Sequence, residues 1–155
     1  MEELVNLLIE KKKTISTMES CTGGGIANAI TNIPNASKVL KFSAVTYSNE
    51  FKIKMGVEEE LINKYTVYST EVARSMAKTI SEYTGSNYGI GVTGQLKKVD
   101  ENNPYGDDDI VYLSIYNRDN DTYYDEKIKL SYDTRCENKE QIINISASKM
   151  LTLIK

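Results

Sequence analysis

The sequence predicts an α/β fold in three layers, α/β/α, around a mixed, mostly parallel sheet of about five to six strands. Three observations predict it. Strand-type and helix-type segments alternate early in the chain, one strand runs into a glycine-rich turn and a helix, and the last two strands form a C-terminal hairpin before a closing helix. Alternation joins parallel strands through helices, whereas consecutive strands pair antiparallel. A length of 155 residues is typical of one domain, so we expect a single domain over residues 1–155.

The first half of the chain contains two expected helices and two expected strands. Residues 2–12 have leucines at helical spacing, and residues 14–19 (TISTME) begin with β-branched side chains typical of a strand. The stretch SCTGGG at residues 20–25 then leads into a helix that begins IANAITNI. Residues 39–47 (VLKFSAVTY) are expected to form a second strand that is buried on both faces.

The second half supplies the rest of the sheet and its cover. Ser69 is a favourable N-cap for a helix over residues 70–84, which Gly85 is expected to end. Residues 95–109 are polar and are expected to form a long loop. The other expected elements are a short helix over residues 57–65, strands over residues 87–93, 110–116 and 122–131, and a final helix over residues 137–154.

Composition excludes several classes of function. The chain has no histidine, which excludes Ser-His and Cys-His catalysis and histidine-ligated metal sites within one chain. Two cysteines, Cys21 and Cys136, are too few for a zinc cluster. A net charge of -3 argues against a nucleic-acid partner, and no apolar run has the length of a membrane span. The acidic and then basic N-terminus is unlike a signal peptide, so we expect a cytoplasmic protein.

Ser20 is the first candidate nucleophile because it lies between an expected strand and a glycine-rich helix start. Backbone N–H groups there can stabilise an oxyanion, and Gly23 and Gly24 allow a ligand to approach the backbone closely. The alternative is that Ser20 and Thr22 only cap the helix. Cys21 is a rival nucleophile, since a helix N-terminus can lower the pKa of a thiol, but it also fits as a small buried side chain.

Lys52 is the candidate base, with Tyr47 beside it after the second strand. Without histidine, a Ser–Lys pair is an economical arrangement of nucleophile and base, provided that burial lowers the pKa of the lysine. The alternative is an ordinary surface lysine. Thr93, at the end of the third strand, either faces the Ser20 cluster or begins a turn. The run Asp107–Asp109 lacks the spacing of a calcium loop, so a solvated loop is expected there.

Four motifs stand in order along the chain: TMESCTGG at residues 17–24, AVTYSNEFK at residues 44–52 followed by MGV, YSTEVARSMA at residues 68–77, and GVTG at residues 91–94. Together they resemble the motifs of the CinA C-terminal domain family, the nicotinamide-nucleotide amidohydrolases. A weaker similarity lies near Arg135, where the family usually has an arginine before its last helix.

This resemblance implies a stand-alone, metal-independent amidohydrolase domain that needs no cofactor. It implies hydrolysis of nicotinamide mononucleotide to nicotinic acid mononucleotide and ammonia, a step of pyridine nucleotide salvage in NAD metabolism. Ser20 would be the nucleophile and Lys52 the base, with Tyr47 beside it and Thr93 at the site. The partner would be a small nucleotide, and a homodimer is compatible with the family. The residues implied to bind substrate are Glu19, Thr22, Gly23, Gly24, Gly94 and Arg135.

The loop at residues 95–109 departs from the family pattern. After the VTG strand the family has a loop of the form GIAGPxGG, whereas this chain reads QLKKVDE. Because glycines let a backbone contact a ligand closely, their loss predicts weak binding of a phosphate, an elevated KM and a mobile loop with few buried contacts. Lys97 or Lys98 would replace some backbone donors. The alternative function is therefore a catalytically weak or inactive member that acts as a nucleotide-binding or interaction domain.

Overall fold

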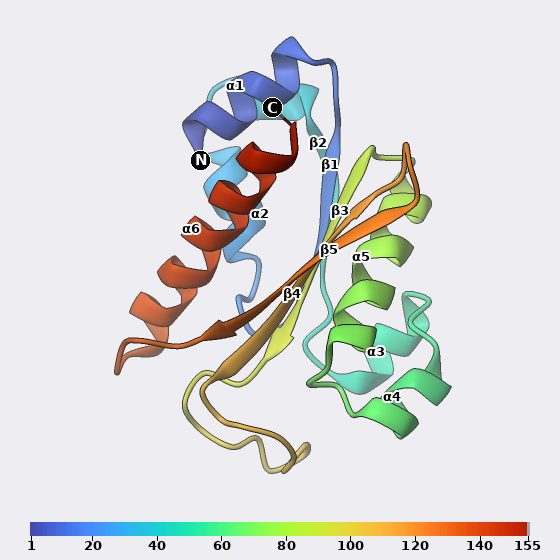
Figure 1. Ribbon diagram of the computed structural model, residues 1–155, viewed down its shortest axis with the longest axis vertical. Coiled ribbons are helices and arrows are strands. Elements are labelled where there is room, and N and C mark those ends of the chain that lie inside the picture. The colour runs from blue at the N-terminus through green and yellow to red at the C-terminus, as the bar shows by residue number, and fades with distance from the viewer. Residues whose placement is uncertain (155) are drawn as a thin grey trace.

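The computed structural model describes residues 1–154 and contains the five-stranded mixed sheet shown in Figure 1. The strand order is β2-β1-β3-β4-β5, with β1 parallel to β2 and β3, and β4 antiparallel to β3 and β5. The strands are β1 (Ile15–Glu19), β2 (Leu40–Val45), β3 (Tyr88–Gly94), β4 (Ile110–Asn117) and β5 (Thr122–Lys129). The predicted mixed sheet with a C-terminal hairpin is confirmed.

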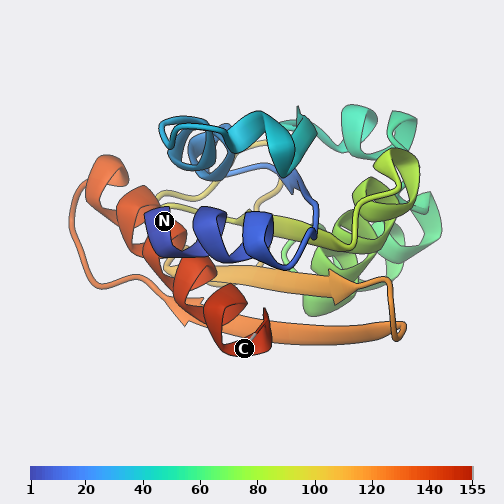
Figure 2. The same ribbon diagram turned by 90° about the horizontal axis from the view of Figure 1, so that it is seen from above.

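Helices cover both faces of the sheet (Figure 1). The helices of one face are α1 (Glu2–Glu10), α2 (Gly25–Thr31) and α6 (Arg135–Ile154), and Figure 2 shows α1 against α6. The helices of the other face are α3 (Asn49–Lys54), α4 (Glu59–Tyr65) and α5 (Thr70–Thr84). A 3₁₀ turn, η1 (Ala36–Lys38), leads into β2.

Two apolar clusters hold the three layers together. The larger cluster packs α1, α2 and α6 onto the sheet and includes Leu8 and Ile15, whereas the smaller one packs α4 and α5 and includes Met18 and Met76. Ile15 and Met18 belong to different clusters because side chains on a strand alternate between the two faces of the sheet. Both faces of β1 are therefore buried, so the residues that follow this strand start from a rigid support.

Helix α5 lies directly on β3 because two strand residues have no side chain. A Cβ at Gly89 would lie 2.0 Å from the carbonyl oxygen of Ala77, and one at Gly91 would lie 2.1 Å from that of Ala73. Ser69 caps the helix by accepting a hydrogen bond from the N–H of Val72 at 3.2 Å. The close packing at Gly89 and Gly91 places the N-terminus of α5 beside the carboxyl end of β3. The predicted boundaries of α5 are confirmed.

One expectation about the second strand is wrong. β2 is not buried on both faces: it is an edge strand, and Phe42 and Val45 are 41% and 52% exposed. The segment after it contains α3, which was not predicted and whose N-cap Ser48 accepts a hydrogen bond from the N–H of Phe51. A six-residue helix leaves little periodicity to read, so sequence patterning does not reveal it.

Candidate active site

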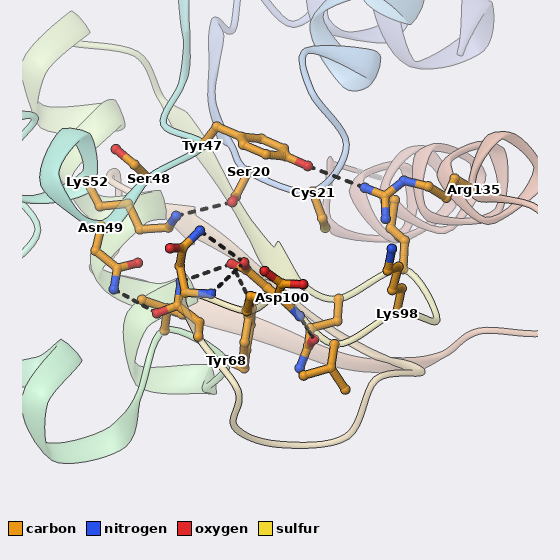
Figure 3. Close-up of a pocket in the computed structure, with 18 residues that line it drawn as sticks. Ser20, Cys21, Tyr47, Ser48, Asn49, Lys52, Tyr68, Lys98, Asp100 and Arg135 are labelled. Atoms are coloured by element: carbon orange, nitrogen blue, oxygen red, sulfur yellow. Dashed lines mark hydrogen bonds between the residues drawn. The ribbon is translucent and has the colours of Figure 1, made fainter.

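The candidate active site is a cavity of about 730 Å³ at the carboxyl ends of the three parallel strands (Figure 3). Its wall is formed by the turn after β1, the segment from β2 into α3, the residues just before α5, the loop after β3, and the start of α6. The lining residues fall into six groups: 20–21, 47–49, Lys52, 67–68, 94–96 with 98–103, and Arg135. Segments far apart in the sequence thus meet at one edge of the sheet, as expected for this class of fold.

Ser20 is the first residue after β1, and its side chain reaches the cavity. Its N–H still bonds to the carbonyl of Val92 at 3.0 Å, which fixes it beside β3. The chain then turns sharply through Gly23 and Gly24, both with positive φ, and enters α2. Positive φ is readily adopted by glycine, so this turn depends on those two residues. The Ser20 hydroxyl is consequently held at the mouth of a tight strand-to-helix turn.

Lys52 provides the nitrogen that faces the Ser20 hydroxyl. Its side chain is only 2% exposed, and Nζ lies 3.1 Å from Ser20 Oγ and 2.8 Å from the carbonyl oxygen of Thr46. Burial disfavours the charged ammonium and lowers the pKa of Lys52 to about 8. A neutral amine is thus readily accessible near physiological pH, within proton-transfer distance of a hydroxyl.

Cys21 lines the same cavity but is a poor nucleophile. Its side chain is 4% exposed, and burial raises the pKa of the thiol to about 12. The reactive form of cysteine is the thiolate, which is scarce at neutral pH when the pKa is so high. The small buried side chain is therefore the interpretation that fits this geometry.

Tyr47 and Arg135 form one side of the cavity mouth. Tyr47 is 65% exposed, and Arg135, at the start of α6, donates a hydrogen bond from a guanidinium nitrogen to the Tyr47 hydroxyl at 3.3 Å. Figure 3 shows the Tyr47 ring extending past Ser20 toward Arg135. Neither Ser20 nor Lys52 is hydrogen-bonded to Tyr47 among residues 1–154, so the structure does not place this hydroxyl in the Ser–Lys pair.

Glu19 and Thr22 do not line the cavity, contrary to the substrate-binding role inferred for them. Glu19 is fully buried and points to the other side of β1 from Ser20, where its carboxylate accepts hydrogen bonds from Thr22 Oγ1 at 2.7 Å and from the N–H groups of Ile26 and Ala27 at 3.0 and 2.9 Å. These bonds cap the first turn of α2. Both side chains thus support the turn that positions Ser20.

Three further predicted site residues also lie outside the cavity wall. Thr93 is fully buried and donates a hydrogen bond to the carbonyl oxygen of Val67 at 2.8 Å, which ties the end of β3 to the segment before α5. Gly23 and Gly24 shape the turn after Ser20 without lining the cavity. Gly94 and Arg135 do line it, as do Ser20, Lys52 and Tyr47.

The loop after β3 covers the cavity and has more buried contacts than its sequence suggests. Gln95 and Leu96 are 3% exposed, and Gln95 donates from its amide to the carbonyl of Tyr105 at 2.7 Å. Asp100 accepts hydrogen bonds from the Tyr68 hydroxyl at 3.4 Å and from Asn103 Nδ2 at 3.1 Å. The expectation of few buried contacts is therefore wrong for the part of the loop next to β3, and the mobility of the loop stays a prediction.

Sequence reasoning missed several cavity residues. Tyr68 and Asn49 lie within motifs that matched the family, so their positions could have been inferred. Gln95 and Asp100 carry no comparable signal, because long-range contacts bring them to the wall. Asp100, for example, accepts a hydrogen bond from the Tyr68 hydroxyl at 3.4 Å across thirty-two positions of sequence.

Residues 1–154 contain no group of three or more His, Cys, Asp or Glu side chains placed to hold a metal ion. Within the same residues, no helix is long and apolar enough to cross a membrane.

The model of the family described as "CinA C-terminal domain" matches residues 1–154. The chain belongs to the CinA C-terminal domain family. Two similar proteins, both named "competence-damage inducible protein", come from Clostridium kluyveri (45% identical over 120 residues, 76% of this chain and 29% of the relative) and Clostridium botulinum strain 657 (36% over 159 residues, 100% and 36%). This CinA domain thus spans about a third of the length of these curated relatives.

Solved structures of CinA proteins share the fold of this chain. A CinA superfamily protein from Klebsiella pneumoniae aligns with a TM-score of 0.90 at 19% identity and covers 99% of this chain and 94% of its own. The competence/damage inducible protein CihA from Agrobacterium tumefaciens aligns with a TM-score of 0.86 at 27% identity, over 99% and 95%. The α/β fold with its mixed sheet is therefore that of the CinA superfamily.

Proposed function

We propose that this CinA domain is an amidohydrolase that converts nicotinamide mononucleotide to nicotinic acid mononucleotide and ammonia through a Ser–Lys mechanism. The observation that supports it is the 3.1 Å separation of Lys52 Nζ and Ser20 Oγ inside a cavity large enough for a nucleotide. Burial of a lysine costs folding free energy because it disfavours the charged ammonium. Strongly perturbed pKa values of this kind cluster at functional sites, which supports a role for Lys52 as a base.

In the acylation step, neutral Lys52 accepts the proton of the Ser20 hydroxyl while Oγ attacks the carboxamide carbon. A bond forms between Oγ and that carbon, and the carbonyl π electrons move onto oxygen. The backbone N–H of Cys21 directly follows the nucleophile and belongs to a residue that lines the cavity, which makes it the candidate oxyanion donor. Collapse of the intermediate breaks the C–N bond, and protonated Lys52 returns its proton to the leaving ammonia.

In the deacylation step, water attacks the ester that joins the substrate to Ser20. Lys52, again neutral, takes a proton from that water and delivers it to Ser20 Oγ as the ester bond breaks. The carboxylic acid is released and the Ser20 hydroxyl is restored. The hydrogen bond from Lys52 Nζ to the Thr46 carbonyl keeps the amine in place throughout both steps.

The substrate class follows from the family together with the cations of the cavity. Arg135 and Lys98 lie together on one side of Figure 3, at a distance from the Ser20–Lys52 pair, and offer positive charge for a phosphate. Lysine and arginine side chains lose rotamer entropy when they bind, unlike the fixed backbone donors of a glycine-rich loop. We therefore expect turnover of the nucleotide with an elevated KM. We expect this reaction to take place in the cytoplasm.

The test is ammonia release from nicotinamide mononucleotide and from unphosphorylated nicotinamide riboside. We expect activity with the nucleotide, its loss in Ser20→Ala, and its retention in Cys21→Ala, whose thiol sits in the same cavity and is the matched control. Activity of Ser20→Ala alongside an inactive, folded Cys21→Ala would overturn the assignment of the nucleophile.

The second candidate function, a nucleotide-binding domain without turnover, is favoured by the altered loop after β3. The same proteins distinguish it. Calorimetric titration of nicotinamide mononucleotide into the unaltered protein would then show saturable binding while the ammonia assay shows no product. Ammonia release that depends on Ser20 would exclude this second candidate.

A further inference from the structure

The charged residues that line the cavity are Lys52, Lys98, Asp100, Glu101 and Arg135, and those labelled in Figure 3 fall into two zones. Lys98 and Arg135 lie toward one side of Figure 3, whereas Asp100 lies centrally, below Ser20 and Lys52. Asp100 acts electrostatically on Lys52, since its negative charge opposes the lowering of the Lys52 pKa. The reaction centre therefore has a carboxylate nearby, and the positive charges suited to an anion lie farther off.

Asp100 is fixed in place and stays ionised. It accepts hydrogen bonds from Asn103 Nδ2 at 3.1 Å, from the N–H of Asn102 at 3.0 Å and from the Tyr68 hydroxyl at 3.4 Å. Its own N–H donates to Gln95 Oε1 at 2.8 Å. Hydrogen bonds from the Asn103 and Asn102 donors hold the pKa of this carboxyl below its ordinary value. Within residues 1–154, Asp100 forms no ion pair.

This arrangement creates an electrostatic problem during catalysis. When Lys52 is neutral, as the reaction requires, Asp100 has no cation nearby to balance it. A negative charge near Ser20 also opposes the oxyanion that forms there. A positive charge on the ligand, next to its carboxamide, would balance both. A ligand with a neutral ring at that position would leave the carboxylate uncompensated.

We infer that Asp100 is a specificity-determining residue that selects carboxamides borne on a positively charged pyridinium ring over carboxamides on an uncharged ring. The inference rests on the proposed function and refines its substrate class to a zwitterion with a cation near the carboxamide and an anion at the Arg135 side. Asp100 belongs to the loop that departs from the family pattern, so this selection is a property of this chain's own loop.

The experiment compares two ligands that differ in ring charge. Nicotinamide mononucleotide has the pyridinium, and benzamide mononucleotide replaces the ring nitrogen with carbon and is uncharged there. Calorimetry in the Ser20→Ala background measures both affinities without turnover. We expect about tenfold tighter binding of the pyridinium ligand, from one partly solvated charge pair. Adding Asp100→Asn should remove most of this preference.

Two comparisons separate charge selection from a structural role. Asp107→Asn makes the same change of net charge at an exposed position of the same loop outside the cavity, and it should leave the preference intact. If Asp100 only anchors the loop through Tyr68 and Asn103, Asp100→Asn will weaken both ligands equally. That result would overturn the inference, as would equal binding of both ligands, or binding of neither, before Asp100 is changed.

The ammonia assay distinguishes this failure from that of the proposed function. Ammonia release from nicotinamide mononucleotide with no ring-charge preference would refute the role of Asp100 alone. A ring-charge preference that Asp100→Asn removes, without ammonia release from the unaltered protein, would refute the proposed reaction and leave the role of Asp100 in binding standing.

Discussion

Between about pH 6 and pH 8, kcat/KM should rise about fiftyfold, almost tenfold over the first pH unit and about fivefold over the second, because only neutral Lys52 can accept the Ser20 proton. The rate should level off above a pKa of about 8, which is where burial places the Lys52 amine. Lys52 Nζ lies 3.1 Å from Ser20 Oγ, so no movement of the chain is needed before proton transfer. The pH profile of ammonia release therefore reports directly on this side chain.

The size of the effect follows from the two pKa values. With its ordinary pKa of 10.5, about 0.03% of Lys52 would be neutral at pH 7. With a pKa of about 8, the neutral fraction is about 10%, a gain of about 300-fold. Burial of one lysine thus supplies more than two orders of magnitude in the concentration of active base, at a cost in folding free energy.

Initial rates of ammonia release across this pH range, at substrate concentrations below KM, measure the profile. Lys54→Met is the matched control, since Lys54 lies on the same helix, is exposed, and pairs with Glu50 rather than with Ser20. Its profile should coincide with that of the unaltered protein. A profile that is flat across the range, or whose midpoint lies near pH 10, would refute the assignment of Lys52 as the base.

Three predictions concern stability, each measured by urea denaturation. The pKa of Lys52 is lower when folded, so between about pH 8 and pH 10.5 the unfolded state binds more protons and stability rises with pH. Lys52→Met should therefore raise the free energy of unfolding at pH 7 by about 1–3 kcal/mol, and this gain over the unaltered protein should vanish above about pH 10. A gain of the same size at pH 7 and above pH 10, or no gain at pH 7, would contradict this. Glu19→Gln turns an amide toward the N–H donors at the start of α2 and should cost about 1.5–3 kcal/mol; an unchanged midpoint would rule out the capping role. Gly91→Ala should cost at least about 3 kcal/mol of unfolding free energy, because its Cβ would lie 2.1 Å from a backbone oxygen of α5. Gly85→Ala is the control: its Cβ meets nothing within 4 Å, so it should cost only about 1–2 kcal/mol through its positive φ. Similar losses in the two variants would show that α5 does not rest on β3 as described.

Helix caps and glycine-rich turns, which depend on a few consecutive residues, could be predicted from the sequence. Ser69 and Gly85 bound α5 as expected, because a side-chain cap and a left-handed glycine are properties of a few consecutive residues. The strand, glycine-rich turn and helix around Ser20 were likewise predictable. These elements place the nucleophile, so the most important part of the candidate site was accessible from the sequence.

The direction of individual side chains was harder to predict. Glu19 and Ser20 are adjacent in the family motif, and both were expected to face the ligand. Successive residues of an extended chain point to opposite faces, so Glu19 turns into the protein and caps α2 while Ser20 turns to the cavity. Thr93 was placed at the correct strand end, but its hydroxyl bonds to the carbonyl of Val67 instead of facing a ligand.

The far wall of the cavity could not be predicted from local patterns. Asp100 contacts Tyr68 across thirty-two positions of sequence, and Asn103 contacts Asn49 across fifty-four. Such contacts depend on how the loop folds back against the start of α3 and the segment before α5, which no periodicity encodes. The missing glycines indicated a changed wall, but not that a carboxylate would stand there.

The formation of an acyl-enzyme on Ser20 tests the central claim most directly. Protein quenched in acid during turnover of nicotinamide mononucleotide, and then digested, should show a peptide that contains Ser20 and is heavier by the mass of the substrate minus ammonia. Fragmentation should place the added mass on Ser20, and Ser20→Ala should lack it. Added mass on the neighbouring Cys21, or continued ammonia release by Ser20→Ala, would contradict the Ser–Lys account.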